Sequence, residues 1–308
     1  MRKILAILSA GILFSAAAYA QDATPETTGG NAGVASGVAM EFAARPFDPV
    51  SFALGGTSAF HSAAARVQKE MKMDVALYAM PWSTRTSKEF DLGADLFFKA
   101  GKHFGLGVDF GMGLGQKYVI YTGIGTQSKQ TFTPMDMRVG LNLAYDILPY
   151  LSLGASVRYL HSKIADKSNL QAVGADVMLA GHAAGFRYAA GVTNIGSKVK
   201  DSAKQTWPIP AAATIAAGYD HAFGKHAIGA SLQGDLFFKG GIRAGAGAQY
   251  AYNDLVFARF GYSYGGKTVL PSYFSLGAGV KFKGVYLDVA AMIGDITGSV
   301  MIGAGYRF

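Results

Sequence analysis

The stretch that decides the fold is residues 90–98, which reads Phe-Asp-Leu-Gly-Ala-Asp-Leu-Phe-Phe. Every second residue from Phe90 to Phe98 is apolar, whereas Asp91, Gly93 and Asp95 fall between them. Successive side chains of a β-strand point to opposite faces, so this period of two predicts a strand with one apolar face and one polar, glycine-containing face.

The same alternation continues from about residue 72 to the end of the chain, for example over 242–250 and 299–308. The second face is rich in Gly, Ser and charged residues, unlike the Thr, Lys and Glu that usually cover the wet face of a soluble β-sandwich. Glycine weakens a strand unless another group must approach it closely. The pattern therefore predicts a barrel with its apolar face in lipid and its glycine face around a filled interior.

The connections between strands form a second regularity. Short connections are predicted near 99–103, 145–150, 181–186, 219–226, 251–255 and 282–285. Mostly longer ones alternate with them near 83–88, 123–133, 162–168, 194–211, 238–242, 264–273 and 293–298. Such alternation is typical of membrane barrels, and Tyr and Phe at the strand ends fit their aromatic girdles. We predict an all-β fold, a transmembrane antiparallel β-barrel of about 14 strands with an N-terminal luminal hatch.

Composition excludes several other classes of protein. The 308 residues include 41 Gly, no Cys and only 16 % charged residues, against roughly 25 % in soluble domains. Beyond the N-terminal apolar segment, no apolar run approaches the roughly 18 residues of a membrane-spanning helix. Without Cys there is no disulfide framework, thiol nucleophile or cysteine-based zinc site.

The N-terminus predicts export from the cytoplasm. Arg2 and Lys3 precede the apolar segment 4–18, and Ala18-Tyr19-Ala20 fits a small-x-small cleavage site. Cleavage at this site would leave a mature chain beginning near Gln21, with the formal net charge lowered from +8 to +6.

Three regions are expected along the chain: a signal peptide over 1–20, a flexible lead and N-terminal hatch over 21–71, and the transmembrane barrel over 72–308. The predicted location is the cell outer membrane, with outer-membrane lipid and lipopolysaccharide around the barrel. No basic run with interleaved aromatic residues indicates nucleic acid.

The last six residues, 303–308, fit the pattern Gly-x-x-aromatic-x-aromatic. They resemble the signal by which outer-membrane barrels are recognised for assembly, which implies the barrel-assembly machinery as a partner. Gly303, Tyr306 and Phe308 carry this resemblance. The alternative is an ordinary last strand that ends on Phe.

Residues 21 to about 71 do not fit the alternation. Pro46 and Pro49 exclude a central strand, so this segment belongs either in the lumen or in the periplasm. The glycine-lined wall favours the lumen, because small residues leave space for a plug. The candidate hatch residues are Phe42, Arg45, Phe47, Asp48, Gly55 and Gly56.

Acidic and basic residues are nearly balanced on the predicted inner face. The expected luminal charge network is Asp91, Asp95, Asp109, Arg138, Arg158, Asp176, Arg187, Asp235, Arg243, Arg259, Lys281 and Arg307, with Asp288 beside it. These charges either brace the strands of a hydrated lumen or hold the hatch to the wall through Arg45 and Asp48.

Enzyme chemistry has little support, and no catalytic residue, metal ligand or cofactor is predicted. His221 and His226 lack a neighbouring ligand set for a metal. The glycine pattern over 109–113 is not followed by the helix that a dinucleotide site requires. His161 beside Ser162 is the single hint of a hydrolase, and chance adjacency explains it better.

Several segments resemble the PorV/PorQ family, a branch of the FadL-like outer-membrane barrels. They are the segment 41–60, with Phe-x-x-x-x-x-Asp-Pro and Leu-Gly-Gly-Thr-Ser-Ala, and the segments 131–136, 151–160, 162–166, 172–177, 191–196 and 207–210. One departure is His61-Ser62-Ala63, where many relatives carry Asn-Pro-Ala. The resemblance implies a barrel of about fourteen strands with an N-terminal hatch, and work in type IX protein secretion.

Two functions remain open. The first is an accessory component of type IX secretion, whose outer loops 123–133, 194–211 and 264–273, with Trp207 and Tyr273, bind exported clients or secretion subunits. The alternative is a FadL-like transporter of hydrophobic small molecules, suggested by the apolar hatch residues Phe42, Phe47, Phe52 and Phe60. An apolar luminal pocket would favour transport, whereas a sealed lumen would favour the accessory role.

Overall fold

The structure is a computed structural model that describes residues 37–84, 88–121, 127–165, 168–200, 204–239, 241–265, 272–294 and 297–308. These residues belong to one unit, Ser36–Phe308. The predicted signal peptide and the flexible lead up to residue 36 lie outside them and remain predictions.

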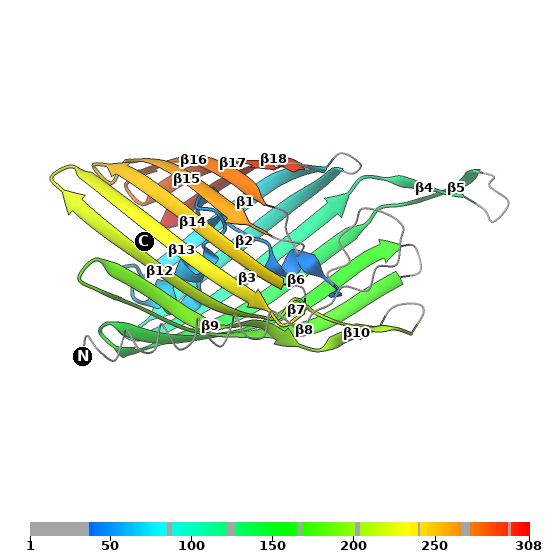
Figure 1. The fold of residues 1–308 in the computed structure, drawn as a ribbon, viewed down its shortest axis with the longest axis horizontal. Coiled ribbons are helices and arrows are strands. Elements are labelled where there is room, and N and C mark those ends of the chain that lie inside the picture. The colour runs from blue at the N-terminus through cyan, green and yellow to red at the C-terminus, as the bar shows by residue number, and fades with distance from the viewer. Residues whose placement is uncertain are drawn as a thin grey trace. The chain divides into compact units, whose positions relative to one another are not determined.

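Fourteen antiparallel strands form a closed barrel, because β1 pairs with β18 and Asp74 lies opposite Arg307 (Figure 1). The barrel strands are β1 (Met73–Thr84), β2 (Lys88–Ala100), β3 (Phe104–Gly115), β6 (Met135–Leu148), β7 (Leu151–Ala165), β8 (Ser168–Ala183), β9 (Phe186–Gly196), β12 (Ala212–Phe223), β13 (His226–Phe237), β14 (Gly241–Tyr252), β15 (Val256–Tyr264), β16 (Tyr273–Phe282), β17 (Val285–Gly294) and β18 (Thr297–Arg307). Closure pairs every strand on both sides, which a sheet in lipid requires. The predicted fold class is confirmed.

Two long connections contain hairpins that the sequence analysis treated as loops. β4 (Tyr118–Tyr121) pairs with β5 (Gln127–Phe132), and β10 (Lys198–Lys200) pairs with β11 (Thr206–Pro208). The prediction of plain loops over 123–133 and 194–211 is therefore wrong in part. Short segments form a ladder there by pairing with each other beyond the barrel wall (Figure 1).

The alternation of short and long connections is incomplete. At one rim the turns are tight, and several use left-handed residues, among them Ala184 and Gly185. At the other rim, β13 ends at Phe237 and β14 begins at Gly241, so this connection is as short as a hairpin turn. The number of about 14 strands was predicted by counting the segments between the connections, so a connection of unexpected length does not change it.

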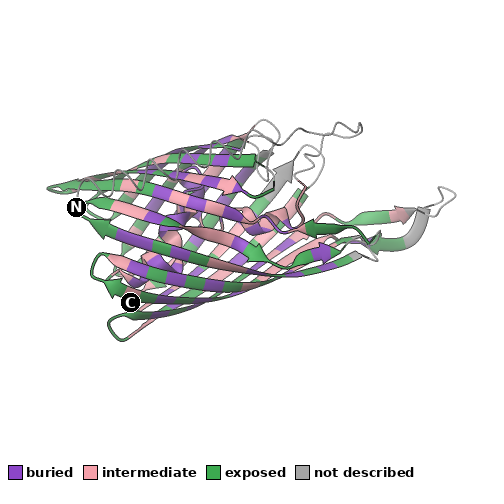
Figure 2. Cartoon of the chain, turned by 60° about the horizontal axis from the view of Figure 1, so that its bottom comes forward, coloured by how far each residue is buried: buried purple, intermediate pink, exposed green. Residues whose placement is uncertain are grey.

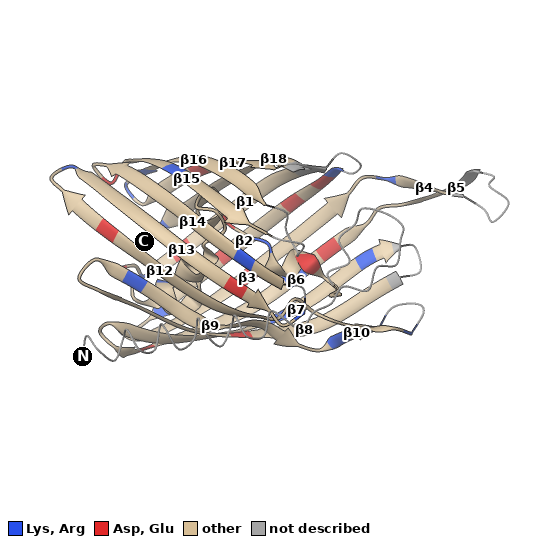
Figure 3. Cartoon of the chain, in the orientation of Figure 1, with Lys and Arg blue, Asp and Glu red and all other residues tan. Residues whose placement is uncertain are grey.

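The barrel exterior is apolar. Buried and exposed residues alternate along the strands (Figure 2), and the exposed positions include Leu77, Leu141 and Leu232, each at least 60 % exposed. Charged positions are few along the strands (Figure 3). An apolar band of this extent on an isolated chain indicates a surface that contacts lipid, because soluble monomers do not expose such patches.

The hatch consists of four short helices: η1 (Glu41–Ala44), α2 (Pro49–Ala53), η2 (Ser58–His61) and α3 (Ala63–Val67). Local sequence explains where α2 and α3 begin. The Asp48 carboxylate accepts a hydrogen bond from Ser51 N at 2.8 Å with Pro49 in the first turn, and Ser62 Oγ accepts one from Ala65 N at 3.4 Å. Among the described residues, no helix has the length and apolar character to cross a bilayer.

The hatch lies inside the barrel. Helix α2 contacts β15, β16, β17 and β18, and α3 contacts β3, β6, β7 and β8. The hatch therefore touches strands on both sides of the barrel.

We expect Asp48→Ala to loosen helix α2. Burial alone would raise the pKa of Asp48, but the nearby His61 ring and the hydrogen bonds from Ser51 outweigh burial and hold this pKa below the ordinary 3.8. The stabilisation from Asp48 is therefore complete above pH 3.8 and is lost as the pH falls below it. Losing the cap costs about 1 kcal/mol, so trypsin should cleave the hatch roughly fivefold faster at neutral pH.

The matched variant is Asp48→Asn, which keeps a good capping side chain without the charge. Its cleavage rate at neutral pH should lie closer to that of the unmodified chain. Equal rates for Asp48→Ala and the unmodified chain would contradict the capping role.

Candidate functional site: the hatch and the luminal cavity

The hatch backbone lies directly on a floor of wall glycines. Gly247 of β14 lies opposite Gly261 of β15. A Cβ at Gly261 would lie 2.2 Å from the nitrogen of Gly55, and a Cβ at Gly247 would lie 2.7 Å from the Cα of Leu54. Gly55 itself has a φ of +69°, and a Cβ there would lie 2.4 Å from the carbonyl oxygen of Tyr262. Only glycine on both surfaces allows this approach.

Wall side chains satisfy the hatch backbone beside this floor. Ser275 Oγ accepts a hydrogen bond from Gly55 N at 3.3 Å and donates one to the carbonyl of Ala53 at 3.0 Å. Gln233 Oε1 accepts one from Ala59 N at 2.9 Å. Buried backbone groups need such partners, so these contacts hold the hatch in one position.

Tyr273 belongs to this seat and not to an outer loop. The sequence analysis placed it in the loop 264–273, but it begins β16 and is only 2 % exposed. Its ring stacks on Phe52 of α2 with centroids 5.7 Å apart, and its hydroxyl would lie 3.1 Å from a Cβ at Gly56. An aromatic residue next to a loop carries no sequence signal for its direction, which the barrel register decides.

Phe47 occupies a second glycine seat. Its ring atoms would lie 2.4 Å from a Cβ at Gly93 and 2.5 Å from one at Gly111. The guanidinium carbon of Arg138 lies 3.3 Å from the ring centroid, and Tyr78 meets the ring edge-on at 5.8 Å and 71°. Both aromatic and cationic contacts therefore fix this side chain.

Phe42 lies at a third contact between the hatch and the wall. It packs, partly buried, against an apolar cluster on η1, β7, β8 and the β10–β11 hairpin. The members of this cluster are Met40, Ala43, Leu160, Leu170, Ala172, Val199 and Ile209. The apolar hatch residues are therefore used to seal the hatch to the wall.

Most of the predicted luminal charges pair with one another between adjacent or next-but-one strands. The pairs are Arg138 with Asp109 at 3.6 Å, Arg158 with Asp109 at 3.8 Å and with Asp176, Arg243 with Asp235 at 2.9 Å, and Arg259 with Asp288 at 2.5 Å. Arg307 pairs at 2.8 Å with Asp74, which the sequence analysis did not single out.

Two predicted charges lie at the rim of the tight turns. Arg187 pairs with Asp220 at 2.5 Å, and Lys281 pairs with Asp254 at 2.6 Å. Both acidic partners are more than 45 % exposed on their side chains. Such solvent-exposed pairs contribute little to stability.

The hatch is joined to the wall by two arginines. Arg45 contacts Glu89 at 3.4 Å and Asp91 at 3.9 Å, whereas Arg66 of α3 contacts Asp95 at 2.6 Å. Arg66 was missed because a single arginine in an alanine-rich segment has no pattern to distinguish it. Asp48 was expected beside the wall charges, but it pairs with His61 of the hatch at 2.8 Å because it caps α2.

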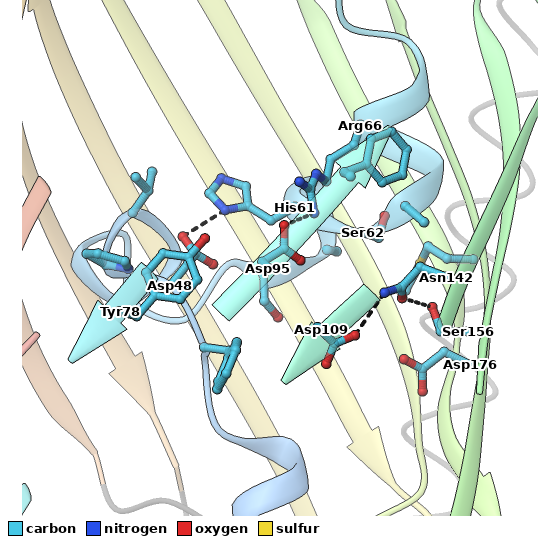
Figure 4. A pocket seen from close by; sticks show the side chains of 18 of the residues that line it. Asp48, His61, Ser62, Arg66, Tyr78, Asp95, Asp109, Asn142, Ser156 and Asp176 are labelled. Atoms are coloured by element: carbon cyan, nitrogen blue, oxygen red, sulfur yellow. Dashed lines mark hydrogen bonds and ion pairs between the residues drawn. The ribbon is translucent and has the colours of Figure 1, made fainter. Parts of the chain in front are cut away.

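A polar cavity of about 460 Å³ lies between the hatch and the wall. At one side, Asp109 accepts a hydrogen bond from Asn142 at 2.8 Å, and Ser156 donates to Asn142 at 2.6 Å (Figure 4). Arg66 and Asp95 face the same space from the hatch and from β2 (Figure 4). The cavity is lined by paired ions together with apolar side chains such as Ala64 and Phe97, so it is not a purely apolar pocket.

A second pocket of about 50 Å³ is mostly apolar and lies between hatch residues 42–47 and the wall. Phe42, Pro46, Met80 and Met301 contribute to its lining. Arg45, Phe47, Tyr78 and Arg138 line both this pocket and the polar cavity. The ring of Phe47 and its two neighbours therefore lie between the two cavities.

The geometry does not build a hydrolase site. Asp48 and Ser51 both contact the same nitrogen of His61, Nδ1, at 2.8 Å and 3.1 Å, so the imidazole cannot relay a proton between them. Ser162 is buried and donates to Asp136 at 2.5 Å, whereas His161 is the next residue on the strand and faces the opposite side.

Metal chemistry has no site in the part of the chain that the structure describes, since no group of three His, Asp or Glu side chains gathers there. The ring of Phe223 stacks with both His221 and His226, at 6.0 Å and 5.5 Å. These two histidines therefore belong to an aromatic row at the turn rim.

The C-terminal residues have mixed environments. Tyr306 is 39 % exposed on the outer surface and packs on Phe308 with ring centroids 4.3 Å apart. Gly303 faces the lumen, where a Cβ would lie 2.6 Å from Cγ of Pro49. Hatch packing is thus a structural reason for glycine at 303, and recognition by the assembly machinery remains a prediction.

Comparison with known proteins shows similarity in fold. No protein-family model matches the chain, and no curated protein matches its sequence. The crystal structure of the Ralstonia pickettii toluene transporter TbuX superposes with a TM-score of 0.64 at 16 % identity, over 87 % of this chain and 100 % of that one. The CymD monoaromatic hydrocarbon channel has a TM-score of 0.58 at 14 % identity, over 84 % and 97 %.

A third similar structure is the Pseudomonas putida toluene transporter TodX, with a TM-score of 0.56 at 13 % identity, over 85 % of this chain and 97 % of that one. The FadL-like part of the sequence resemblance agrees with these structures, whereas its finer assignment to PorV/PorQ remains a prediction. The chain therefore shares the fold of these structures, with a closed barrel of fourteen strands around an N-terminal hatch.

Proposed function

We propose that the protein is a FadL-like transporter of hydrophobic small molecules in the outer membrane. The observation that carries the proposal is a hatch-filled barrel that matches TbuX, TodX and CymD over nearly their whole lengths. Two of these structures are toluene transporters and the third is a monoaromatic hydrocarbon channel.

The hatch contacts strands on both sides of the barrel, so passage through the lumen would require the hatch to move or rearrange. The hatch is held by hydrogen bonds to Ser275 and Gln233 and by ion pairs through Arg45 and Arg66. Each of these contacts is individually small, so a partial displacement does not require unfolding of the barrel.

The type IX accessory role rests on the sequence resemblance alone. One of the residues invoked for partner binding, Tyr273, is buried against Phe52 and is not available to a partner. We therefore put transport forward as the function. The surface proteins of a deletion strain would show whether the protein also recruits secretion subunits or clients.

A disulfide lock provides the test of transport. Thr57 of the hatch and Ser231 of β13 have side-chain oxygens 3.2 Å apart and are both buried, and the chain has no other Cys to interfere. In a deletion strain that expresses Thr57→Cys/Ser231→Cys, toluene uptake should fall to the level of the empty strain under oxidising conditions. A reducing agent should restore it.

The single variant Thr57→Cys is the control and should transport under both conditions. Uptake by the oxidised double variant at the full rate would reject a moving hatch. Uptake in the deletion strain equal to that of the parent would reject transport, and loss of type IX clients from its surface would favour the accessory role instead.

A further inference from the structure

One row of residues across four neighbouring strands builds the seat of Phe47. Tyr78 of β1 lies opposite Gly93, Gly93 lies opposite Gly111, and Gly111 lies opposite Arg138 of β6. Neighbouring strands are about 4.8 Å apart, so the backbones at Tyr78 and Arg138 are about 14 Å apart. Between them lie only the two glycines, which have no side chains. The row therefore forms a flat slot with an aromatic edge on one side and a guanidinium on the other.

The slot is matched to a single aromatic ring. The glycine floor accepts a planar face, because a side chain at either position would meet the ring at 2.5 Å or less. The Arg138 guanidinium stacks on the ring at 3.3 Å, and Tyr78 contacts it edge-on, the two arrangements that aromatic rings prefer. The ring that fills the slot belongs to the hatch, which is the part of the molecule that must move.

Arg138 also has an unused hydrogen-bond donor beside the ring. Within the described part of the chain, its Nε is buried without a hydrogen-bond partner, and the nearest carboxylate oxygen, Oδ1 of Asp109, is 3.6 Å away. A buried donor without a partner is costly, so an acceptor atom delivered to this position would be favoured.

The two compartments beside Phe47 have different linings. The small pocket is mostly apolar, although charged side chains such as Glu89 and Asp91 also line it, whereas the large cavity is lined by apolar and charged side chains together. A ring with a polar end can place its apolar part and its polar end against matching side chains there.

We propose that this slot is a binding subsite for a single-ring aromatic carboxylate, and that Phe47 is an internal ligand which the incoming ring displaces. The carboxylate bonds to Arg138 while the ring lies on Gly93 and Gly111. This inference rests on the proposed transport function and narrows its substrate class. The inference is tested by equilibrium binding to the purified protein, whereas transport is tested by uptake into cells. A failure of the one can therefore be distinguished from a failure of the other.

The test is ligand-observed fluorine NMR with 4-fluorobenzoate and the purified full-length protein in detergent. Phe47→Ala vacates the slot and removes the competing ring, so the apparent dissociation constant should fall about tenfold or more. Phe47→Leu removes the aromatic face but keeps apolar volume. It should also lower the apparent dissociation constant, and it replaces Phe47→Ala if that variant does not fold. Unlabelled toluene and cyclohexanecarboxylate should compete more weakly than benzoate.

Phe60→Ala is the matched control. Phe60 is a buried hatch phenylalanine that also lies beneath an arginine, Arg187 at 4.5 Å, but it lies away from the slot, so its removal should leave affinity unchanged. In the Phe47→Ala background, Gly111→Val should abolish binding, and Arg138→Met should weaken benzoate about tenfold while toluene is retained.

Three results would overturn the proposal. The first is an affinity that Phe47→Ala or Phe47→Leu leaves unchanged or weakens. The second is equal binding of benzoate and cyclohexanecarboxylate by the vacated slot, since that would show no recognition of the ring. Tightening by Phe60→Ala equal to that of Phe47→Ala would likewise assign the effect to general loosening of the hatch.

Discussion

Gly261→Val is expected to displace the hatch and open the barrel to ions. The new Cβ would lie 2.2 Å from the nitrogen of Gly55 and 2.6 Å from the carbonyl carbon of Leu54, so the conflict is with backbone and no rotamer relieves it. Overpacking of this kind costs about 1–3 kcal/mol, which raises the ratio of displaced to seated hatch by roughly tenfold or more. Ion conductance of the purified protein in a planar bilayer should rise accordingly.

The matched control is Gly234→Val on strand β13, which lies two strands away from β15. Gly234 lies between two inward-facing residues, Gln233 and Asp235, and so faces outward, where its added Cβ would meet Ile215 Cγ2 at 3.8 Å. This variant should remain closed. Conductance of Gly261→Val at the level of Gly234→Val would mean that the glycine floor does not seat the hatch.

Asp109→Leu is expected to cause the largest loss of stability. Asp109 is 5 % exposed, lies 3.6 Å from Arg138 and 3.8 Å from Arg158, and accepts a hydrogen bond from Asn142. Its removal leaves two largely buried arginines with less counter-charge, and breaking a buried pair costs about 3–5 kcal/mol. The transition between folded and unfolded mobility in a heated detergent gel should shift down by roughly 10 °C.

Asp220→Leu provides the comparison. Asp220 also pairs with an arginine, Arg187, but its side chain is 48 % exposed at the turn rim. Exposed pairs contribute about 0–1 kcal/mol, so the gel transition should shift only slightly. Equal shifts for the two variants would show that the luminal pairs do not stabilise the barrel more than surface pairs do.

The reason predicted from the sequence for the wall glycines explains some of them and not others. We expected small inward residues because a plug must approach the wall, and Gly247 and Gly261 fit that reason. Other glycines serve the charges: a Cβ at Gly140 would lie 2.2 Å from Asp109 Oδ2, and one at Gly279 would lie 2.1 Å from Asp288 Oδ1. The sequence cannot separate the two uses, because each depends on which residue lies opposite in the ladder.

The sequence predicted which residues belong to the candidate site, but not which of them contact one another. Phe47 and Arg138 were both singled out, one as a hatch residue and one as a luminal charge, yet nothing in the chain order indicated their stacking. They are 91 positions apart in the sequence and meet because closure of the barrel brings β6 beside the hatch. The same holds for Arg66, whose partner Asp95 is set by the register of β2.

The residue order by itself determined which face of each ribbon is apolar, that fourteen strands follow one another, and that 38–60 cannot join them. These properties depend on neighbours one or two positions apart and on two prolines, so they are written in local sequence. Only the folded barrel decided which charges pair, where the hatch rests and that a phenylalanine ring lies between a guanidinium and two glycines. These contacts join residues from distant segments, and their partners are set by strand register and closure, which no local pattern contains.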